Sequence, residues 1–194
     1  MELHLEPATT ALVAIDLQRG IVANPATPHD PKDVVARAAR MVKALRAAGG
    51  TVVLVHVTPS RDGRDGLKAI TDASGPVGRI PSALPPDWSE IVPELEPEKA
   101  DVVITKRQWG AFYGTELDLQ LRRRGVGTII LCGISTNVGV ESTARDAFER
   151  GYQQVFVEDA MSARAAEEHA AAISTLFPRI GRVRSTEDVL AALE

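Results

Sequence analysis

Three short segments of the chain hold residues that could act together on a bound molecule. Asp16 ends the apolar run 11–16, Lys106 follows the apolar run 101–105, and the segment 133–139 (GISTNVG) opens a stretch with helical periodicity. A carboxyl group can deliver or accept a proton, and an ammonium group can stabilise negative charge. Backbone N–H groups at the start of a helix favour polar or negatively charged atoms. We therefore treat the three segments as one candidate site.

The elements that would carry this site follow the pattern of an α/β protein. Runs rich in β-branched residues, and nearly continuous in apolar character, predict strands that are covered on both faces, which is typical of parallel sheets. They lie at 11–16, 51–57, 101–105, 128–133 and 154–159, with a weaker sixth run at 179–185. Stretches with apolar residues three and four apart predict helices at 34–45, 115–124, 138–150, 164–177 and from 186 onward. The alternation predicts a three-layer α/β/α sandwich.

In such a sheet the polar residues that follow the strands meet at one rim, where α/β proteins bind ligands. Each residue also has an ordinary structural interpretation. Asp16 alone is slightly better explained as a cap of the following turn, and Lys106 alone as a solvated surface lysine. Ser135, Thr136 or Asn137 could serve only as a helix N-cap. The conjunction of all three segments is what favours a functional site.

Composition narrows the possible functions. The chain has 194 residues, 44% of them hydrophobic, which predicts one domain over 1–194. Its formal net charge of −4 gives no indication of binding to nucleic acids or membranes. The single Cys132 excludes an internal disulfide and a multi-cysteine zinc site. No signal-like segment begins the sequence, so we expect a cytoplasmic protein.

The motifs at these positions resemble the isochorismatase-like superfamily, also called the cysteine hydrolases. The shared pattern joins D-x-Q (Asp16, Gln18), a strand that ends in Lys106, and the segment GISTNVGVESTARDA at 133–147. The similarity covers nearly the whole chain, from residue 10 to residue 183. It implies a six-stranded parallel sheet in the order 3-2-1-4-5-6, which would place Asp16 and the 133–139 loop on neighbouring strands.

In most members of the superfamily a cysteine attacks an amide carbonyl, an aspartate handles its proton and a lysine stabilises charge. The resemblance maps these roles onto position 139, Asp16 and Lys106. It also implies a cis peptide between Ile134 and Ser135, with the N–H groups of Ser135 and Gly139 as an oxyanion hole. Because Gly139 has no side chain, the covalent thiolate route is closed. Cys132 lies inside an apolar run, and we expect it to be buried and inert.

Glycine at this position resembles the isochorismatases proper, which hydrolyse a vinyl ether without a covalent intermediate. The resemblance then implies that Asp16 is the general acid, that Lys106 orients and tunes it, and that Gly139 leaves space for water or substrate. A neighbouring cation lowers the pKa of Asp16 and burial raises it, so the acid role requires burial to dominate. Two alternatives stay open: a C–N hydrolase with Ser135 or Thr136 as nucleophile, and a catalytically silent small-molecule binding protein.

The substrate is expected to be small and anionic, because the segment 107–114 combines an arginine with three aromatic residues. For Trp109 and Tyr113 individually, simple packing is an equally good interpretation. The predicted substrate contacts are as follows: Gln18, Arg107, Trp109, Phe112, Tyr113, Ser135 and Asn137. Glu141 and Arg145 are interpreted as a helix-surface pair.

The sequence predicts neither a metal site nor a cofactor, because His4, His29, His56 and His169 are scattered and form no ligand motif. The Asp/His cluster of nicotinamidases in the same superfamily is also missing. A Pro-rich segment at about 58–100 interrupts the βα rhythm and is expected to cover a site, pack on a neighbouring subunit, or be partly mobile. Relatives are commonly oligomers, so we expect a homo-oligomer, a dimer or a tetramer.

Overall fold

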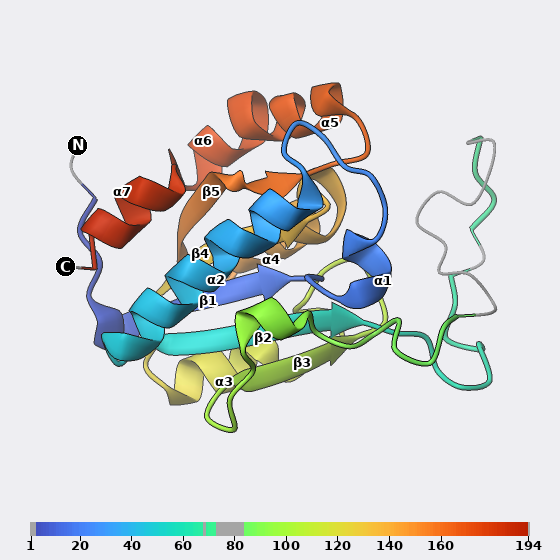
Figure 1. The fold of residues 1–194 in the computed structure, drawn as a ribbon, viewed down its shortest axis with the longest axis horizontal. Coiled ribbons are helices and arrows are strands. Elements are labelled where there is room, and N and C mark those ends of the chain that lie inside the picture. The colour runs from blue at the N-terminus through green and yellow to red at the C-terminus, as the bar shows by residue number, and fades with distance from the viewer. Residues whose placement is uncertain (1–2, 68, 73–83, 194) are drawn as a thin grey trace.

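The computed structural model describes residues 3–67, 69–72 and 84–193, and it contains a single six-stranded sheet within them (Figure 1). The strands are β1 (Thr10–Ile15), β2 (Thr51–Val57), β3 (Val102–Lys106), β4 (Thr128–Ile134), β5 (Gln153–Ser162) and β6 (Arg182–Arg184). All neighbouring strands run parallel, in the order β3-β2-β1-β4-β5-β6. The predicted α/β class and strand order are therefore confirmed.

Helices cover both faces of this sheet. The α-helices are α1 (Arg19–Val22), α2 (Pro31–Ala47), α3 (Leu117–Arg123), α4 (Glu141–Glu149), α5 (Ala166–Ala171), α6 (Phe177–Ile180) and α7 (Thr186–Ala191). Two short 3-10 helices lie at Pro7–Thr9 and Pro93–Leu95, and two π-helical turns at Thr136–Val140 and Ala172–Leu176. No helix in the described part of the chain is long and apolar enough to cross a bilayer.

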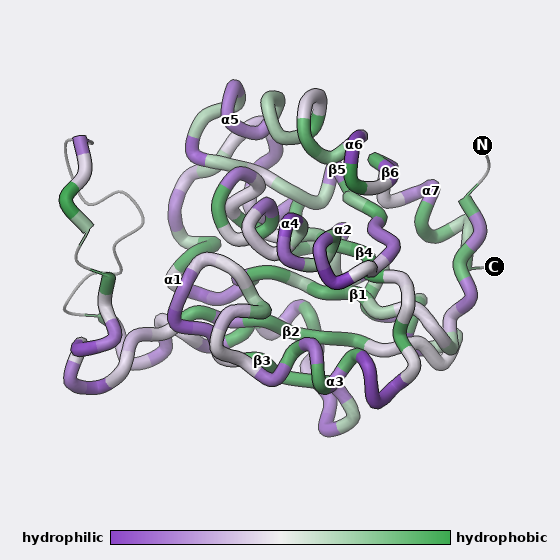
Figure 2. Tube along the Cα trace, turned by 180° about the vertical axis from the view of Figure 1, so that it is seen from behind, coloured by the Kyte–Doolittle hydropathy of each residue, from purple (hydrophilic) through white to green (hydrophobic). Residues whose placement is uncertain are grey.

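The two faces of the sheet explain the continuous apolar runs. Alternate residues of β1 enter different cores: Val13 and Ile15 pack with α3 and α4, whereas Leu12 and Ala14 pack with α2 and α7. Every residue of β1 is buried, and Figure 2 shows the central strands as hydrophobic along most of their length. A strand with both faces covered needs no polar alternation.

Two helices differ in extent or continuity from the stretches that the sequence predicts. The stretch 138–150 begins earlier, with the π-helical turn Thr136–Val140 before α4. The stretch 164–177 is divided into α5, a second π-helical turn and α6. Pro178 lies in the first turn of α6 and has no backbone N–H to continue a regular ladder, which explains the wider turn before it.

Strand β5 is longer than predicted because it contains a bulge. Leu131 of β4 pairs with Phe156, but Gly133, two residues later, pairs with Met161. The extra residues of β5 displace Glu158 and Asp159 from the regular ladder. Asp159 accepts hydrogen bonds from the backbone and the hydroxyl of Thr186, which ties the start of α7 to the bulge.

The Pro-rich segment has two structurally different halves. Residues 88–92 pack along the chain that follows Asp16, where the N–H of Arg19 donates to the carbonyl of Glu90 and the N–H of Val92 donates to that of Leu17. The described part before the uncertain residues extends away from the sheet (Figure 1), with Leu67 and Ile70 exposed. Residues 88–92 therefore pack against the rim of the sheet at β1.

Gly133 illustrates how closely β1 and β4 approach at this rim. Its φ is +122°, and a Cβ there would lie 2.0 Å from the carbonyl oxygen of Ile15. We expect Gly133→Ala to lower the free energy of unfolding by about 2–3 kcal/mol, from backbone strain and this clash. Urea unfolding measures the change. Gly127→Ala is the matched control, because nothing lies within 4 Å of a Cβ at Gly127, and equal losses in both variants would contradict the interpretation.

Candidate active site

The centre of the site is a buried ion pair between the ends of β1 and β3. Lys106 Nζ lies 2.8 Å from Asp16 Oδ2, and the two side chains are only 2% and 8% exposed. Lys106 also donates to the carbonyls of Trp109 (2.7 Å) and Gln108 (3.2 Å), so three acceptors surround its ammonium. The structure therefore brings together the two charged residues that the sequence placed in one site.

Asp16 is held in an unusual state. Its φ is +54°, in the left-handed region that residues other than glycine rarely occupy, and such strain often marks functional positions. Its Oδ1 is buried and has no hydrogen-bond partner. Burial raises the pKa of Asp16, and the charge and hydrogen bond of Lys106 oppose that shift without cancelling it. Burial dominates, which is what an acid role requires.

Gly139 lies directly against this pair. A Cβ built on Gly139 would be 3.0 Å from Asp16 Oδ2 and 3.4 Å from Lys106 Nζ. Any side chain at position 139 would thus contact both charged groups, as the mapping from the resemblance expected. Because glycine has no side chain, only the backbone of the π-helical turn Thr136–Val140 is present at this position.

The loop that carries Gly139 has two features expected of a ligand-binding turn. The peptide bond between Ile134 and Ser135 is cis, as predicted. Asn137 Oδ1 is buried without a hydrogen-bond partner, so a ligand can satisfy it. Ser135 is half-buried and precedes the first helical residue. The roles of these residues in substrate binding stay predictions.

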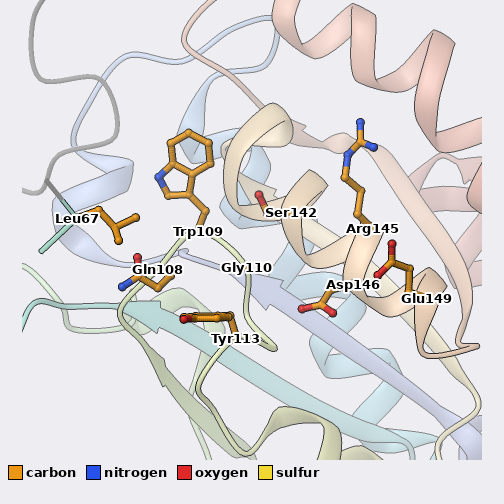
Figure 3. A pocket seen from close by; sticks show the side chains of 9 residues that line it. All are labelled: Leu67, Gln108, Trp109, Gly110, Tyr113, Ser142, Arg145, Asp146 and Glu149. Carbon is orange, nitrogen blue, oxygen red and sulfur yellow. The ribbon is translucent and has the colours of Figure 1, made fainter. Parts of the chain in front are cut away.

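A cavity of about 550 Å³ opens beside this centre (Figure 3). Trp109 and Tyr113 line one side, and Ser142, Arg145 and Asp146 of α4 line the other. Asp16, Lys106 and Gly139 do not line it, but Gln108 and Trp109, whose carbonyls accept from Lys106, form its wall. The cavity therefore adjoins the charged pair without containing it.

Two of the predicted substrate contacts have structural roles in the fold. The side-chain amide of Gln18 donates to the carbonyls of Val57 and Trp88, and its oxygen accepts from the N–H of Val57. Gln18 thus joins β1 to β2 and to the Pro-rich segment. Phe112 is buried in the core, with its ring stacked on Tyr152. These contacts explain how both side chains are held in place, and their contact with substrate stays a prediction.

The remaining predicted contacts fall on the surface. Arg107 donates to the carbonyl of Thr58 and lies 3.6 Å from the carboxylate of Asp65, so it faces the Pro-rich segment. Trp109 and Tyr113 are exposed cavity residues. Arg145 is paired with Glu141 at 2.9 Å, which confirms the helix-surface interpretation, although Arg145 also lines the cavity.

A polar cluster that no sequence motif indicates lies next to the loop. Thr136 Oγ1 lies 2.9 Å from His169 Nδ1, and both residues are buried. His169 and His29 converge on Glu158 from opposite ends of the sequence. Burial lowers the pKa of His169, and Glu158 opposes that shift without cancelling it. The prediction that the histidines are scattered is wrong for His29 and His169. The β5 bulge and the packing of α5 bring them together, and neither feature has a motif that can be recognised in the sequence.

Cys132 is buried in β4, and burial raises the pKa of its thiol to about 12. Since the thiolate is the reactive form, we expect iodoacetamide to leave the folded protein unmodified and Cys132→Ala to retain full turnover. Mass spectrometry after alkylation, with a urea-unfolded sample as the positive control, measures the first effect. Alkylation of the folded protein with loss of activity would contradict this assignment.

Comparisons with known proteins agree with this fold. The model of the Isochorismatase domain matches residues 10–188. The isochorismatase family protein YwoC of Bacillus subtilis (strain 168) is 51% identical over 191 residues, which cover 97% of this chain and 96% of YwoC. An isochorismatase family protein from Burkholderia thailandensis has a solved structure with a TM-score of 0.91 and 48% identity, covering 98% of this chain and 97% of that one.

A more distant relative carries a named activity. The ureidoacrylate amidohydrolase RutB of Methylobacterium radiotolerans is 36% identical over 217 aligned residues, which cover 96% of this chain and 81% of RutB. The family model, the near-complete coverage by relatives and the matching fold lead to one conclusion: the chain belongs to the isochorismatase family.

Proposed function

We propose that this isochorismatase-family hydrolase cleaves a vinyl ether in a small anionic metabolite, such as isochorismate, without a covalent enzyme intermediate. The observation that carries the proposal is that the buried Asp16, whose pKa is raised, lies beside position 139, where a Cβ would be 3.0 Å from its Oδ2 but no side chain is present. An acid is therefore available beside the position where a nucleophile would otherwise stand.

The reaction uses the protonated carboxyl group of Asp16. Its proton adds to the terminal vinyl carbon, and the electron pair of the C=C bond forms the new C–H bond. The resulting oxocarbenium ion captures water, which loses a proton to the Asp16 carboxylate and leaves a hemiketal. The hemiketal collapses to a ketone and an alcohol, so for isochorismate the products are pyruvate and a dihydroxy-cyclohexadiene carboxylate. Lys106 holds the carboxyl group in place and stabilises its charged form.

Amide hydrolysis is the second candidate, and the similarity to RutB favours it. It would require a nucleophile other than a thiol at position 139. Thr136 has a buried hydroxyl that already contacts His169, and Ser135 is half-buried at the start of the same loop. Because Gly139 offers no attacking atom beside Asp16, we favour the vinyl ether.

The test is an assay of purified protein against isochorismate, with ureidoacrylate and a panel of amides in parallel. We expect pyruvate release from isochorismate and no covalent adduct in intact-protein mass spectrometry. Amide turnover with an acyl-enzyme adduct would instead establish the second candidate. Binding of isochorismate with no turnover over hours would show a silent binding protein. The expected homo-oligomer stays a prediction, which light scattering tests.

A further inference from the structure

A second cluster of polar side chains reaches the 135–140 loop through Thr136, and the proposed reaction does not use it. His29 comes from the loop before α2, Glu158 from the bulge of β5, and His169 from α5. One nitrogen of each imidazole and one carboxylate oxygen all lie within 4.8 Å of one another. Two imidazoles and a carboxylate form a ligand set that suits Zn²⁺ and related transition metals.

The distances from Glu158 to the two imidazoles match the distances between neighbouring ligands of such an ion. His29 Nε2 lies 3.3 Å from Glu158 Oε1, and His169 Nε2 lies 3.6 Å from the same oxygen. In a tetrahedral zinc site with bonds near 2.0–2.1 Å, neighbouring ligand atoms are about 3.3 Å apart. Two of the three separations are thus close to the edge length of such a tetrahedron, and all three donor atoms lie within 4.8 Å of one another.

His169 gives the strongest independent indication. Its side chain is 4% exposed, and its Nε2 is buried without a hydrogen-bond partner, since 3.6 Å to Glu158 is too long for one. Its Nδ1 lies 2.9 Å from Thr136 Oγ1. A histidine that binds a metal through Nε2 carries its proton on Nδ1 and donates it to an outer partner, and Thr136 is placed to accept it.

Hydrogen bonds hold the loop that carries His29 against the end of β5. His29 N donates to Ser162 Oγ (3.0 Å), and Ser162 Oγ donates to His29 O (2.7 Å). An antiparallel bridge between Thr27 and Ala163 fixes the same loop on the end of β5. A site held in this way is largely formed before an ion arrives. Glu158 is 38% exposed and His29 is 23% exposed, so an ion can reach them from solvent.

From these observations we propose that His29, Glu158 and His169 bind one divalent transition-metal ion of the Zn²⁺ type, with water in the remaining position. The ion would connect the loop before α2, β5 and α5. Through His169 and Thr136 it would also stabilise the start of the turn that carries Gly139. The role is structural, and it is independent of which bond the enzyme cleaves.

Calorimetric titration of Zn²⁺ into untagged, EDTA-dialysed protein tests the proposal. We expect one equivalent to bind, and Co²⁺ substitution to give the visible absorption of a tetrahedral site. His29→Gln and Glu158→Gln should weaken binding by about 100-fold or more, and Thr136→Val by about 10–100-fold, as for loss of an outer partner. His4→Gln, at an exposed histidine outside the cluster, is the matched control and should bind as the parent protein does.

Thermal unfolding separates binding from folding defects. Zn²⁺ should raise the Tm of the parent protein and of His4→Gln, because an ion bound only by the native state stabilises it, and should leave the Tm of His29→Gln unchanged. No stoichiometric uptake by the parent protein, or equal affinity in His29→Gln and His4→Gln, would overturn the proposal and leave an ordinary hydrogen-bonded cluster.

Discussion

Asp16→Asn should lower kcat/KM for the vinyl ether substrate by about 10²–10⁴-fold, the range that a positioned general acid contributes. Asparagine keeps the size of the side chain and an oxygen for Lys106, but it cannot deliver the proton. The loss should appear in kcat, because the proton is transferred only in the transition state. Steady-state kinetics with coupled detection of the ketone product measure both constants.

A matched control distinguishes chemistry from folding in this experiment. Asp33→Asn changes an exposed aspartate in the first turn of α2, and it should leave kcat/KM unchanged. Circular dichroism and urea unfolding should show that Asp16→Asn is folded. Retention of more than about a tenth of the parent kcat/KM in folded Asp16→Asn would contradict the acid role, since even the weaker general acids contribute more.

Lys106→Met should destabilise the protein by about 3–5 kcal/mol at pH 8, because it leaves the buried Asp16 carboxylate without its cation. The sign of the pH dependence follows from the pKa of Asp16, which burial raises and Lys106 lowers. Without Lys106 that pKa rises further above its unfolded value, so the folded variant binds a proton that the unfolded chain has released. Stability is therefore lost as the pH rises from the unfolded pKa to the folded pKa.

Urea unfolding at pH 5 and pH 8 measures this effect. The deficit of Lys106→Met relative to the parent should be smaller at pH 5, where the unpaired carboxyl group is more fully protonated. Lys43→Met, at an exposed lysine of α2, is the control and should show no such dependence. A deficit that is equal at both pH values would show that lost packing, rather than an uncompensated charge, is responsible.

The fold was predictable because its signals are local and strong. Strands β1, β2, β4 and β5 are buried on both faces over most of their length, so their apolar runs are nearly continuous. Strand β3 differs, because Val103 and Thr105 are exposed. All six strands lie at the predicted positions within a few residues. The bulge in β5 has no such signal, because it depends on how Glu158 and Asp159 interact with α7 and distant loops. The strand order came from the motif resemblance, since apolar periodicity does not determine which strands are neighbours.

The site was predictable only in part. Asp16, Lys106 and position 139 meet because strand ends share one rim, which the topology determines. The structural role of Gln18 was not predictable, because its partners are backbone groups of Val57 and Trp88, which are remote in sequence. Convergence of His29 and His169 likewise needs tertiary structure, since 129 residues separate His29 from Glu158.

The dependence of kcat/KM on pH tests the central claim most directly, namely that Asp16 works as a protonated acid beside a position without a nucleophile. For the parent protein acting on isochorismate, kcat/KM should fall as the pH rises through the raised pKa of Asp16, because the proton to be delivered is then lost. A value of kcat/KM that instead rises with pH through the same range would mean that the carboxylate acts as a base, and would contradict the account.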